Sequence, residues 1–191
     1  MRKNMKVADK QKVKLSNICF DGKDLQIRKN NMIVFLDIDG VIATSKSYND
    51  YPDLLDPRCI KALNYLTHTL KAKIVISSTW RTEGLVHLKD LLKSAGVKAE
   101  VIGLTKHIYS PFHDEGSPRG LEILQWIKDN EYKGEYVVVD DEISDISPHI
   151  NEANILHTGR NAFSKGGLKI KDVEKYINRR RMHIITLKLL I

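Results

Sequence analysis

The segment IVFLDIDGVI, residues 33–42, combines residue types that can do chemistry with a spacing that can bring them together. An apolar, β-branched run ends in Asp37, Asp39 follows two positions later, and Gly40 allows a sharp turn. Residues i and i+2 of an extended segment face the same side, so both carboxylates can enter one pocket. Two carboxylates that close repel each other unless a cation or a shared proton lies between them. The segment predicts a Mg²⁺ site with one aspartate as nucleophile and the other as acid/base; the structural alternative is a strand followed by an Asx-type turn.

A second polar cluster, Ser77-Ser78-Thr79-Trp80-Arg81, closes the apolar run KIVIS. The hydroxyls of Ser77 and Ser78 can donate hydrogen bonds to a phosphoryl oxygen, and Arg81 can bind an anion through two nitrogens. Serine and threonine after a strand also commonly cap a helix. The cluster therefore indicates phosphate binding only in combination with the aspartates.

A third cluster lies in the string VVVDDEISD, which places Asp140, Asp141 and Asp145 at the end of another apolar run. Carboxylate oxygens are hard ligands that suit Mg²⁺, which commonly takes one or two carboxylates plus waters and phosphate oxygens. Arg119, at the start of a predicted helix, can add a positive charge beside the phosphate. The structural alternatives are a turn-and-cap role for Asp140 and Asp141 and a solvent-exposed position for Arg119.

An alternation of apolar, β-branched runs with helical patterns positions these clusters. We predict strands at 33–38, 73–77, 98–102, 135–139 and 153–157, and helices at 57–71, 84–95, 118–130 and 169–180. Asp56-Pro57 and Ser117-Pro118 are helix-start signals with Pro in the first helical position, and Gly96 is a C-cap. The alternation predicts an α/β fold, a three-layer Rossmann-like parallel sheet with helices on both faces. Ligands of such sheets bind outside the carboxyl ends of the strands, where these clusters fall.

Length and composition indicate one soluble globular domain with extensions. The 191 residues are 42% hydrophobic and 29% charged, and they can bury a sizeable core. No run reaches the roughly 18 continuous apolar residues of a membrane helix, and the basic N-terminus lacks a signal peptide's apolar region. Cys19 and Cys59 match no metal-binding spacing, which indicates a reducing compartment. We therefore expect a cytoplasmic protein, although a secreted bacterial effector would share these features.

Charge divides the chain into three parts. Residues 1–31 hold nine Lys/Arg against three Asp/Glu, and residues 165–191 hold eight against two, so each end carries +6. Residues 32–164 hold 14 against 19, or −5. Such basic flanks are commonly solvated, but they can also contact nucleic acid or an anionic membrane surface.

The predicted organisation follows these parts. We expect a basic N-terminal extension at 1–31, with a hairpin turn at Asp21-Gly22, and a folded domain at 32–178. Residues 179–191 form a basic and apolar C-terminal extension that either adds a strand or begins a region continuing beyond it.

Together, the motifs resemble those of the haloacid dehalogenase (HAD) superfamily of phosphohydrolases over about residues 32–160. FLDIDGVI is similar to the first motif, which implies Asp37 as nucleophile and Asp39 as general acid/base. The same motif implies Mg²⁺ contacts from the Asp37 carboxylate and the Asp39 backbone carbonyl. ISST is similar to the second motif and implies a phosphate-binding hydroxyl at Ser78 or Ser77.

The remaining motifs are similar with one departure. VVVDDEISD resembles the fourth motif, which implies Asp141 as a direct Mg²⁺ ligand and Asp145 as a supporting one. The third motif usually supplies Lys, and Arg119 is the candidate here. The strings SSTWR and RGLEILQWI are also similar, over a narrower range, to the small HAD domains associated with RNA-repair proteins.

The resemblance implies a Mg²⁺-dependent phosphatase that acts through an aspartyl-phosphate. About 35 residues separate Gly40 from the end of the second strand and about 40 separate Arg81 from Arg119, so neither gap holds the cap domain of HAD enzymes for small metabolites. The loop His107–Gly116 is too short to be a cap, but it can line the entrance. A capless site implies a phosphorylated macromolecule as substrate.

We favour a phosphoprotein, with phosphotyrosine as one form, because the acidic body offers no track for a polynucleotide. A polynucleotide 3′-phosphatase is the alternative supported by the basic flanks. A non-catalytic binding module on a HAD scaffold is the third.

Overall fold

The computed structural model describes residues 32–50, 54–108, 118–159 and 166–189. The predicted turn at Asp21-Gly22 and residues 109–116 of the predicted entrance loop lie outside these ranges.

Five parallel strands form one sheet in the order β3-β2-β1-β4-β5. They are β1 Met32–Leu36, β2 Ala72–Ile76, β3 Val101–Leu104, β4 Tyr136–Asp140 and β5 Ile155–His157. Because the chain winds outward from β1 in both directions, the carboxyl ends of β1 and β4 form the topological switch point. Ligands of open α/β sheets bind at such a point.

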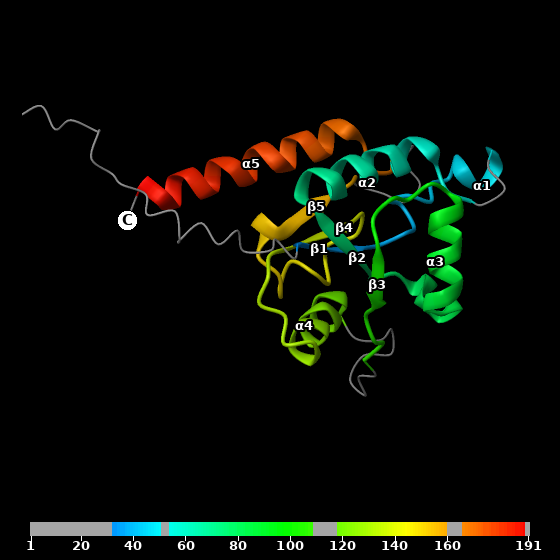
Figure 1. Cartoon of the computed structure of the whole chain (residues 1–191), viewed down its shortest axis with the longest axis horizontal. Helices are drawn as coiled ribbons and strands as arrows, with labels where there is room; N and C mark the ends of the chain where they lie inside the picture. Colours follow the sequence, from blue (N-terminus) through cyan, green and yellow to red (C-terminus); the bar gives the residue numbers. More distant parts are fainter. Residues whose placement is uncertain (1–31, 51–53, 109–117, 160–165, 190–191) are drawn as a thin grey trace, which may run out of the picture.

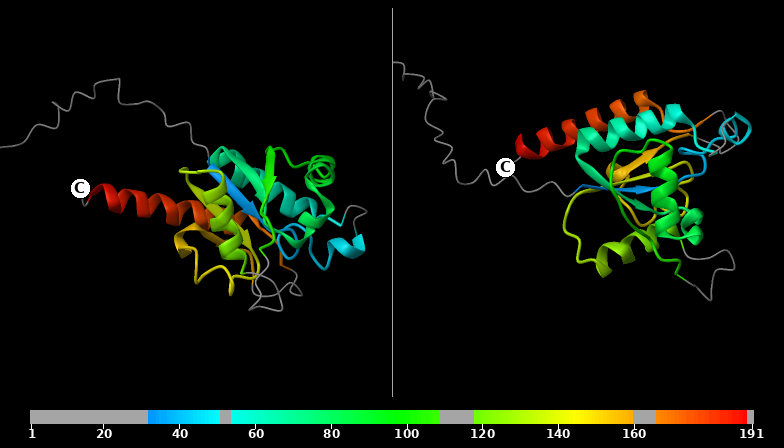
Figure 2. Two further views of the ribbon diagram at one scale, coloured as in Figure 1. Left: turned by 90° about the horizontal axis from the view of Figure 1, so that it is seen from below. Right: turned by 45° about the vertical axis from the view of Figure 1, so that its right-hand side comes forward.

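Helices cover both faces of the sheet (Figure 1). The helices α2 Pro57–Leu70, α3 Leu85–Ser94 and α5 Ile170–Leu189 share one hydrophobic core with the sheet, whereas α4 Arg119–Asp129 belongs to a second core. The right-hand view in Figure 2 shows α2 and α5 side by side, with α4 across the sheet from them. The predicted three-layer, Rossmann-like α/β fold is confirmed.

Side chains of β1 alternate between these two cores. Val34 and Leu36 pack in the larger core, Ile33 and Phe35 pack in the smaller one, and all are buried. This burial on both faces is typical of a central parallel strand. The same alternation turns the next residue, Asp37, toward the α4 side of the sheet.

The third strand begins at Val101, three residues later than the predicted start at residue 98. Asn64 on α2 explains the delay, because its side chain accepts a hydrogen bond from the Lys98 N–H and donates one to the Gly96 carbonyl. Residues 96–98 are therefore bound to α2 and not to β2.

Helix ends follow the predicted signals with one exception. Asp56 caps α2 by accepting from the Arg58 N–H at 2.9 Å, and Gly96 follows the end of α3 with φ +91°. The exception is α4, which begins at Arg119 with Pro118 as its cap residue, one position later than predicted. Ser117 lies outside the described residues.

The helix α5 is longer than predicted and continues to Leu189. The expected boundary at 178/179 falls inside it, and the expected alternative of an added strand is wrong. Residues 170–189 contain neither Gly nor Pro, so no breaker stops the helix where its polar stretch ends. In the described part of the chain, no helix combines the length and apolarity that crossing a membrane requires.

Candidate active site

Three aspartates converge at the switch point between β1 and β4. Asp37 follows β1, Asp140 ends β4 and Asp141 comes next. One carboxylate oxygen from each of the three lies within 4.8 Å of the other two. The Asp37 N–H donates to the Val139 carbonyl at 3.0 Å, so the ladder between the two strands sets the spacing of Asp37 and Asp140.

Arg119 reaches this cluster from the first turn of α4. One of its nitrogens, Nη1, lies 2.5 Å from Asp37 Oδ1 and 3.2 Å from Asp140 Oδ2. The Arg119 backbone N–H donates to Asp145 Oδ2 at 2.9 Å, so Asp145 caps the helix that carries the arginine. Asp145 therefore supports the site through α4. Its predicted role as a metal ligand stays a prediction.

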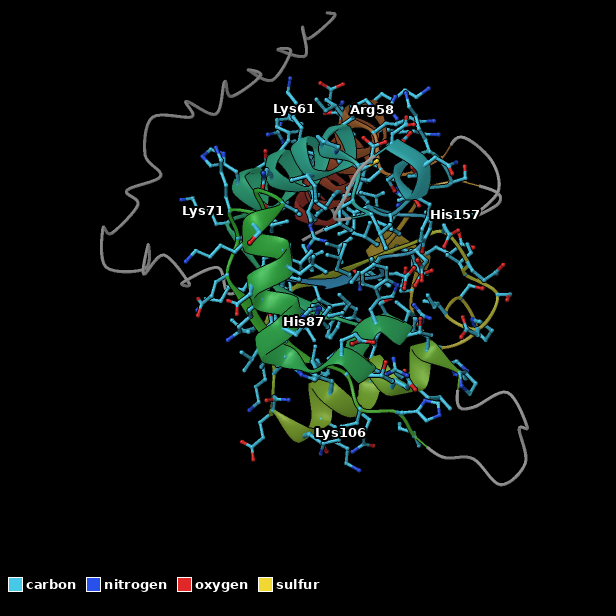
Figure 3. The ribbon with its side chains drawn as sticks, turned by 90° about the vertical axis from the view of Figure 1, so that its right-hand side faces the viewer. Arg58, Lys61, Lys71, His87, Lys106 and His157 are labelled. Carbon is cyan, nitrogen blue, oxygen red and sulfur yellow. The ribbon has the colours of Figure 1, made fainter. Side chains whose placement is uncertain are left out.

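Gly40 permits the close approach of Asp141. Gly40 has φ +67°, and a Cβ at this position would overlap the carboxylate of Asp141. From the other side, His157 Nε2 lies 2.9 Å from the Asp141 carbonyl oxygen (Figure 3 labels His157). Glycine at position 40 is thus required by the packing of Asp141 as well as by the turn.

Burial makes the carboxylate cluster hold protons more tightly than free aspartate. Burial first, and then repulsion from Asp37, keeps the pKa of Asp140 well above its ordinary range although Arg119 acts against this. Burial also raises the pKa of Asp37, against hydrogen bonds from Arg119 and Ser78. Burial raises the pKa of Asp141 too. Negative charge in the cluster is therefore only partly compensated by the protein.

These residues fit a divalent metal ion. When ionised, three carboxylates against one guanidinium leave two negative charges uncompensated. All the ligand atoms on offer are hard oxygens, which is the donor set that Mg²⁺ prefers. The cluster comprises Asp37, Asp140 and Asp141, whereas the carboxylates of Asp39 and Asp145 are occupied by other partners.

Asp39 lies beside the cluster with both oxygens hydrogen-bonded. Tyr48 Oη donates to Oδ1 at 2.7 Å, and Trp80 Nε1 donates to Oδ2 at 2.9 Å. Partial burial and the Asp39 carboxylate raise the pKa of Tyr48 to about 12, so the phenol stays protonated at neutral pH.

The two predicted phosphate-binding serines lie at the carboxyl end of β2, next to β1. The Ser78 hydroxyl acts to lower the pKa of the Asp37 carboxyl, against the effect of burial. Ser77 is fully buried, and among the described residues its Oγ has no hydrogen-bond partner. A buried hydroxyl without a partner costs free energy, and a phosphate oxygen would supply the missing partner.

Arg81 binds a buried glutamate of α4. Its Nη1 is 2.9 Å from Glu122 Oε2, with the two side chains only 12% and 2% exposed. Thr105 Oγ1 and His107 Nδ1 also lie within hydrogen-bond distance of Arg81. Its role as a phosphate ligand stays a prediction.

Four further residues of the site could not be assigned from the sequence. Tyr48 and Trp80 hold Asp39, Glu122 holds Arg81, and Gly120 lets α4 approach the turn after β4. For Glu122, the available signal was its place between apolar residues in RGLEILQWI, because a charged residue that such a helix buries needs a partner.

The parallel sheet, the aspartates at its switch point and the supporting serine and arginine define a HAD-like domain. The sequence model of a family described as "HAD domain in Swiss Army Knife RNA repair proteins" matches residues 33–167. The chain belongs to this family, as its narrower resemblance predicted. Searches of curated proteins and of solved structures gave no significant match. HAD domains are generally phosphohydrolases, so the family implies a phosphoesterase-type function.

Proposed function

We propose that the protein is a Mg²⁺-dependent phosphomonoester hydrolase that uses Asp37 as nucleophile and Asp39 as general acid/base. The observation that carries this proposal is the convergence of Asp37, Asp140 and Asp141, with one arginine nitrogen bound to the two buried members, Asp37 and Asp140. A cluster of carboxylates with raised pKa values lowers the stability of a fold, and such clusters are found mainly at functional sites.

The reaction divides into two displacements at phosphorus. In the first, an Asp37 oxygen bonds to phosphorus while the bond to the leaving oxygen breaks, and Asp39 gives that oxygen its proton. In the second, Asp39 takes a proton from water, the water oxygen bonds to phosphorus, and the bond to Asp37 breaks. Inorganic phosphate leaves and both aspartates return to their starting states.

Other residues of the chain stabilise the transferring phosphoryl group. The contact of Arg119 with Asp37 supports a role for its guanidinium in stabilising the charge that develops on the phosphoryl oxygens. The hydroxyls of Ser77 and Ser78 can donate to the same oxygens. Asp37, Asp140 and Asp141 would hold Mg²⁺, with the Asp39 carbonyl as a further ligand, and a bound Mg²⁺ would neutralise phosphoryl charge.

For the substrate, we infer a phosphorylated polynucleotide end, such as an RNA 3′-phosphate. The family description names RNA-repair proteins, and each basic flank carries +6. This order reverses the one predicted from the sequence, where the acidic body favoured a phosphoprotein. The −5 charge of residues 32–164 keeps a phosphoprotein as the second candidate.

The short connection between β1 and β2 supports a macromolecular substrate. Between β1 and β2, the described residues hold only α1 Ser47–Asp50 and α2. A four-residue helix cannot close over a small metabolite, so a macromolecule would itself exclude water from the site.

The first experiment compares wild-type protein with Asp37→Asn on an aryl phosphate, with Mg²⁺ and with EDTA. We expect Mg²⁺-dependent release of phosphate from the wild type and none from the variant, with the same melting temperature or a higher one for Asp37→Asn. Unchanged hydrolysis by Asp37→Asn would exclude this site. A 3′-phosphorylated oligonucleotide assayed beside a phosphotyrosine peptide, at several salt concentrations, then separates the two substrate classes.

A further inference from the structure

The Asp39 carboxylate is held from two sides by aromatic residues that come from different parts of the chain. Tyr48 lies nine positions away on α1 and donates to Oδ1 at 2.7 Å. Trp80 lies 41 positions away on the 3-10 turn η1 Thr79–Glu83 and donates to Oδ2 at 2.9 Å. Each donor is neutral and carries a single proton, so the pair fixes both oxygens without adding charge.

Tyr48 is half exposed, but the residue before it is held by hydrogen bonds. The preceding residue, Ser47, is fully buried and accepts from the Thr44 N–H at 2.7 Å. The Ser47 hydroxyl also lies 2.6 Å from the Leu54 carbonyl oxygen. These contacts anchor α1 to the loop after β1, so Tyr48 has a fixed base from which to reach Asp39.

Trp80 is anchored by its own neighbours. Ser78 accepts from the Trp80 N–H, and the adjacent Arg81 forms the buried ion pair with Glu122 on α4. The same helix carries Arg119, which binds Asp37. The position of Asp39 is thereby connected to that of Asp37 through η1 and α4.

We propose that Tyr48 and Trp80 are positioning residues that hold the Asp39 carboxylate in the orientation from which it exchanges a proton with the leaving oxygen and with the attacking water. The catalytic part of this inference rests on the proposed function. The contact between Asp39 and the two aromatic residues does not.

A positioning role has a consequence that general damage to the fold lacks. Breaking the bond between phosphorus and a poor leaving group requires a proton on the departing oxygen, whereas a nitro-substituted phenolate leaves without one. Because kcat/KM reports steps up to the first irreversible one, it isolates formation of the Asp37 phosphoryl-enzyme. Removal of either aromatic donor should therefore lower kcat/KM for phenyl phosphate much more than for dinitrophenyl phosphate.

The kinetic test compares Tyr48→Phe and Trp80→Phe with wild type on these two substrates at saturating Mg²⁺. We expect each variant to lose about tenfold or more in kcat/KM on phenyl phosphate, part of the roughly 10²–10⁴-fold that a positioned acid or base contributes. On dinitrophenyl phosphate we expect less than about threefold. Tyr65→Phe removes the hydroxyl of another partly exposed tyrosine, on α2, and should leave both values unchanged.

An equal loss on both substrates, or no loss on either, would overturn the positioning role. Because Tyr48→Phe removes one exposed oxygen only, it keeps the test valid should Trp80→Phe fail to fold. Thermal melts of all variants accompany the assay.

A second measurement needs no activity. The chain has two tryptophans, so an NMR spectrum of isotope-labelled protein shows two indole N–H signals, which Trp80→Phe assigns. Asp39→Ala should shift the Trp80 signal and leave the Trp126 signal in place. An unmoved Trp80 signal would overturn the proposed contact. Should the wild type hydrolyse neither phosphate, the proposed function fails, and this signal alone then decides whether the two aromatic residues hold Asp39.

Discussion

Among the described residues, Arg119 is the cation that binds both Asp37 and Asp140, and the geometry of these contacts indicates which substitutions the site tolerates. Both of its contacts to the cluster run through one nitrogen, Nη1. A lysine ammonium can also offer one nitrogen to two carboxylates. Lysine could not replace arginine in this way at a site that uses two nitrogens of the guanidinium. The identity of the side chain here is therefore less important than its charge.

We predict that Arg119→Gln lowers kcat/KM on an aryl phosphate by about 10²–10³-fold, as removal of one preorganised donor commonly does. Arg119→Lys should retain most of the activity. Steady-state kinetics at saturating Mg²⁺ measure both. Equal losses in the two variants would mean that the fork geometry of the guanidinium is required for catalysis.

Asp140 gives the site a pH-dependent stability that Mg²⁺ should cancel. Its pKa is raised well above 3.8, mainly by burial, so between 3.8 and the raised value the folded metal-free protein binds more protons than the unfolded chain. The free energy of unfolding must then fall as the pH rises through this window. A divalent ion that binds the ionised cluster acts in the opposite direction.

We expect Asp140→Asn, measured without metal, to gain stability over the wild type progressively as the pH rises above 3.8. Chemical denaturation at a series of pH values, with EDTA, measures the difference. Added Mg²⁺ should stabilise the wild type at neutral pH and have little effect on Asp140→Asn. A difference between the two proteins that stays constant with pH would contradict the assignment.

At the scale of elements, the N-terminus of α4 is placed by a close contact with the turn after β4. The Gly120 N–H donates to the Asp145 carbonyl, and a Cβ on Gly120 would lie 3.1 Å from that oxygen and 3.0 Å from the Ile146 carbonyl oxygen. Backbone atoms cannot yield as a flexible side chain does. Any added Cβ must therefore move the helix, and Arg119 with it.

We predict that Gly120→Ala costs about 1–3 kcal/mol of stability by overpacking and lowers kcat/KM by about tenfold or more, because a displacement of about 1 Å in a site can cost 10²-fold. Gly103→Ala is the matched control, since its Cβ would meet Trp126 only at an ordinary distance of 3.4 Å. Chemical denaturation measures the stability of the two variants, and steady-state kinetics measure their kcat/KM. Full activity in Gly120→Ala would show that α4 can shift without affecting the site.

The elements also show how far the sequence can predict this molecule. Strand ends were predictable from apolar, β-branched runs, and parallel topology places strand ends together, so the meeting of Asp37 with Asp140 and Asp141 followed from pattern alone. The contacts of Tyr48 and Trp80 with Asp39 did not follow. They depend on how two short turns are folded, and hydrophobic periodicity carries no information about that.

The starts of β3 and α4 differ from the prediction because they too depend on contacts between distant parts of the chain. The start of β3 was displaced by a side chain of α2 that binds residues 96 and 98, a tertiary contact that overrides local strand propensity. The start of α4 depends on a carboxylate 26 positions away in the chain, Asp145. Local signals therefore located these two elements, whereas contacts between elements fixed where they begin.

At the scale of the whole molecule, the basic flanks and the acidic body carry opposite net charge. The body of residues 32–164 carries −5 and includes the three clustered aspartates of the candidate site, whereas residues 1–31 carry +6. Lysines of the body do reach its surface: the view onto α3 in Figure 3 labels Lys61, Lys71 and Lys106 across that face. A polynucleotide substrate would be attracted by the basic flank while its phosphorylated end enters an acidic site that is neutralised by metal.

We therefore predict that neutralising the N-terminal flank affects only the polymeric substrate. Six lysines of this flank are replaced by glutamine in the variant: Lys3, Lys6, Lys10, Lys12, Lys14 and Lys23. On a 3′-phosphorylated oligonucleotide, kcat/KM should fall, and its logarithmic salt slope should flatten by about 0.7 for each phosphate that the flank no longer neutralises. Hydrolysis of an aryl phosphate should not change.

The matched control carries Lys61→Gln, Lys89→Gln and Lys93→Gln, three exposed lysines of α2 and α3. It should keep the wild-type salt slope, because the body is acidic overall and its lysines are interspersed with carboxylates. A slope that flattens in the control and not in the flank variant would place the polynucleotide along α3. A slope unchanged in both would show that electrostatic capture of a polyanion has no part in substrate selection, and would return the phosphoprotein to first place.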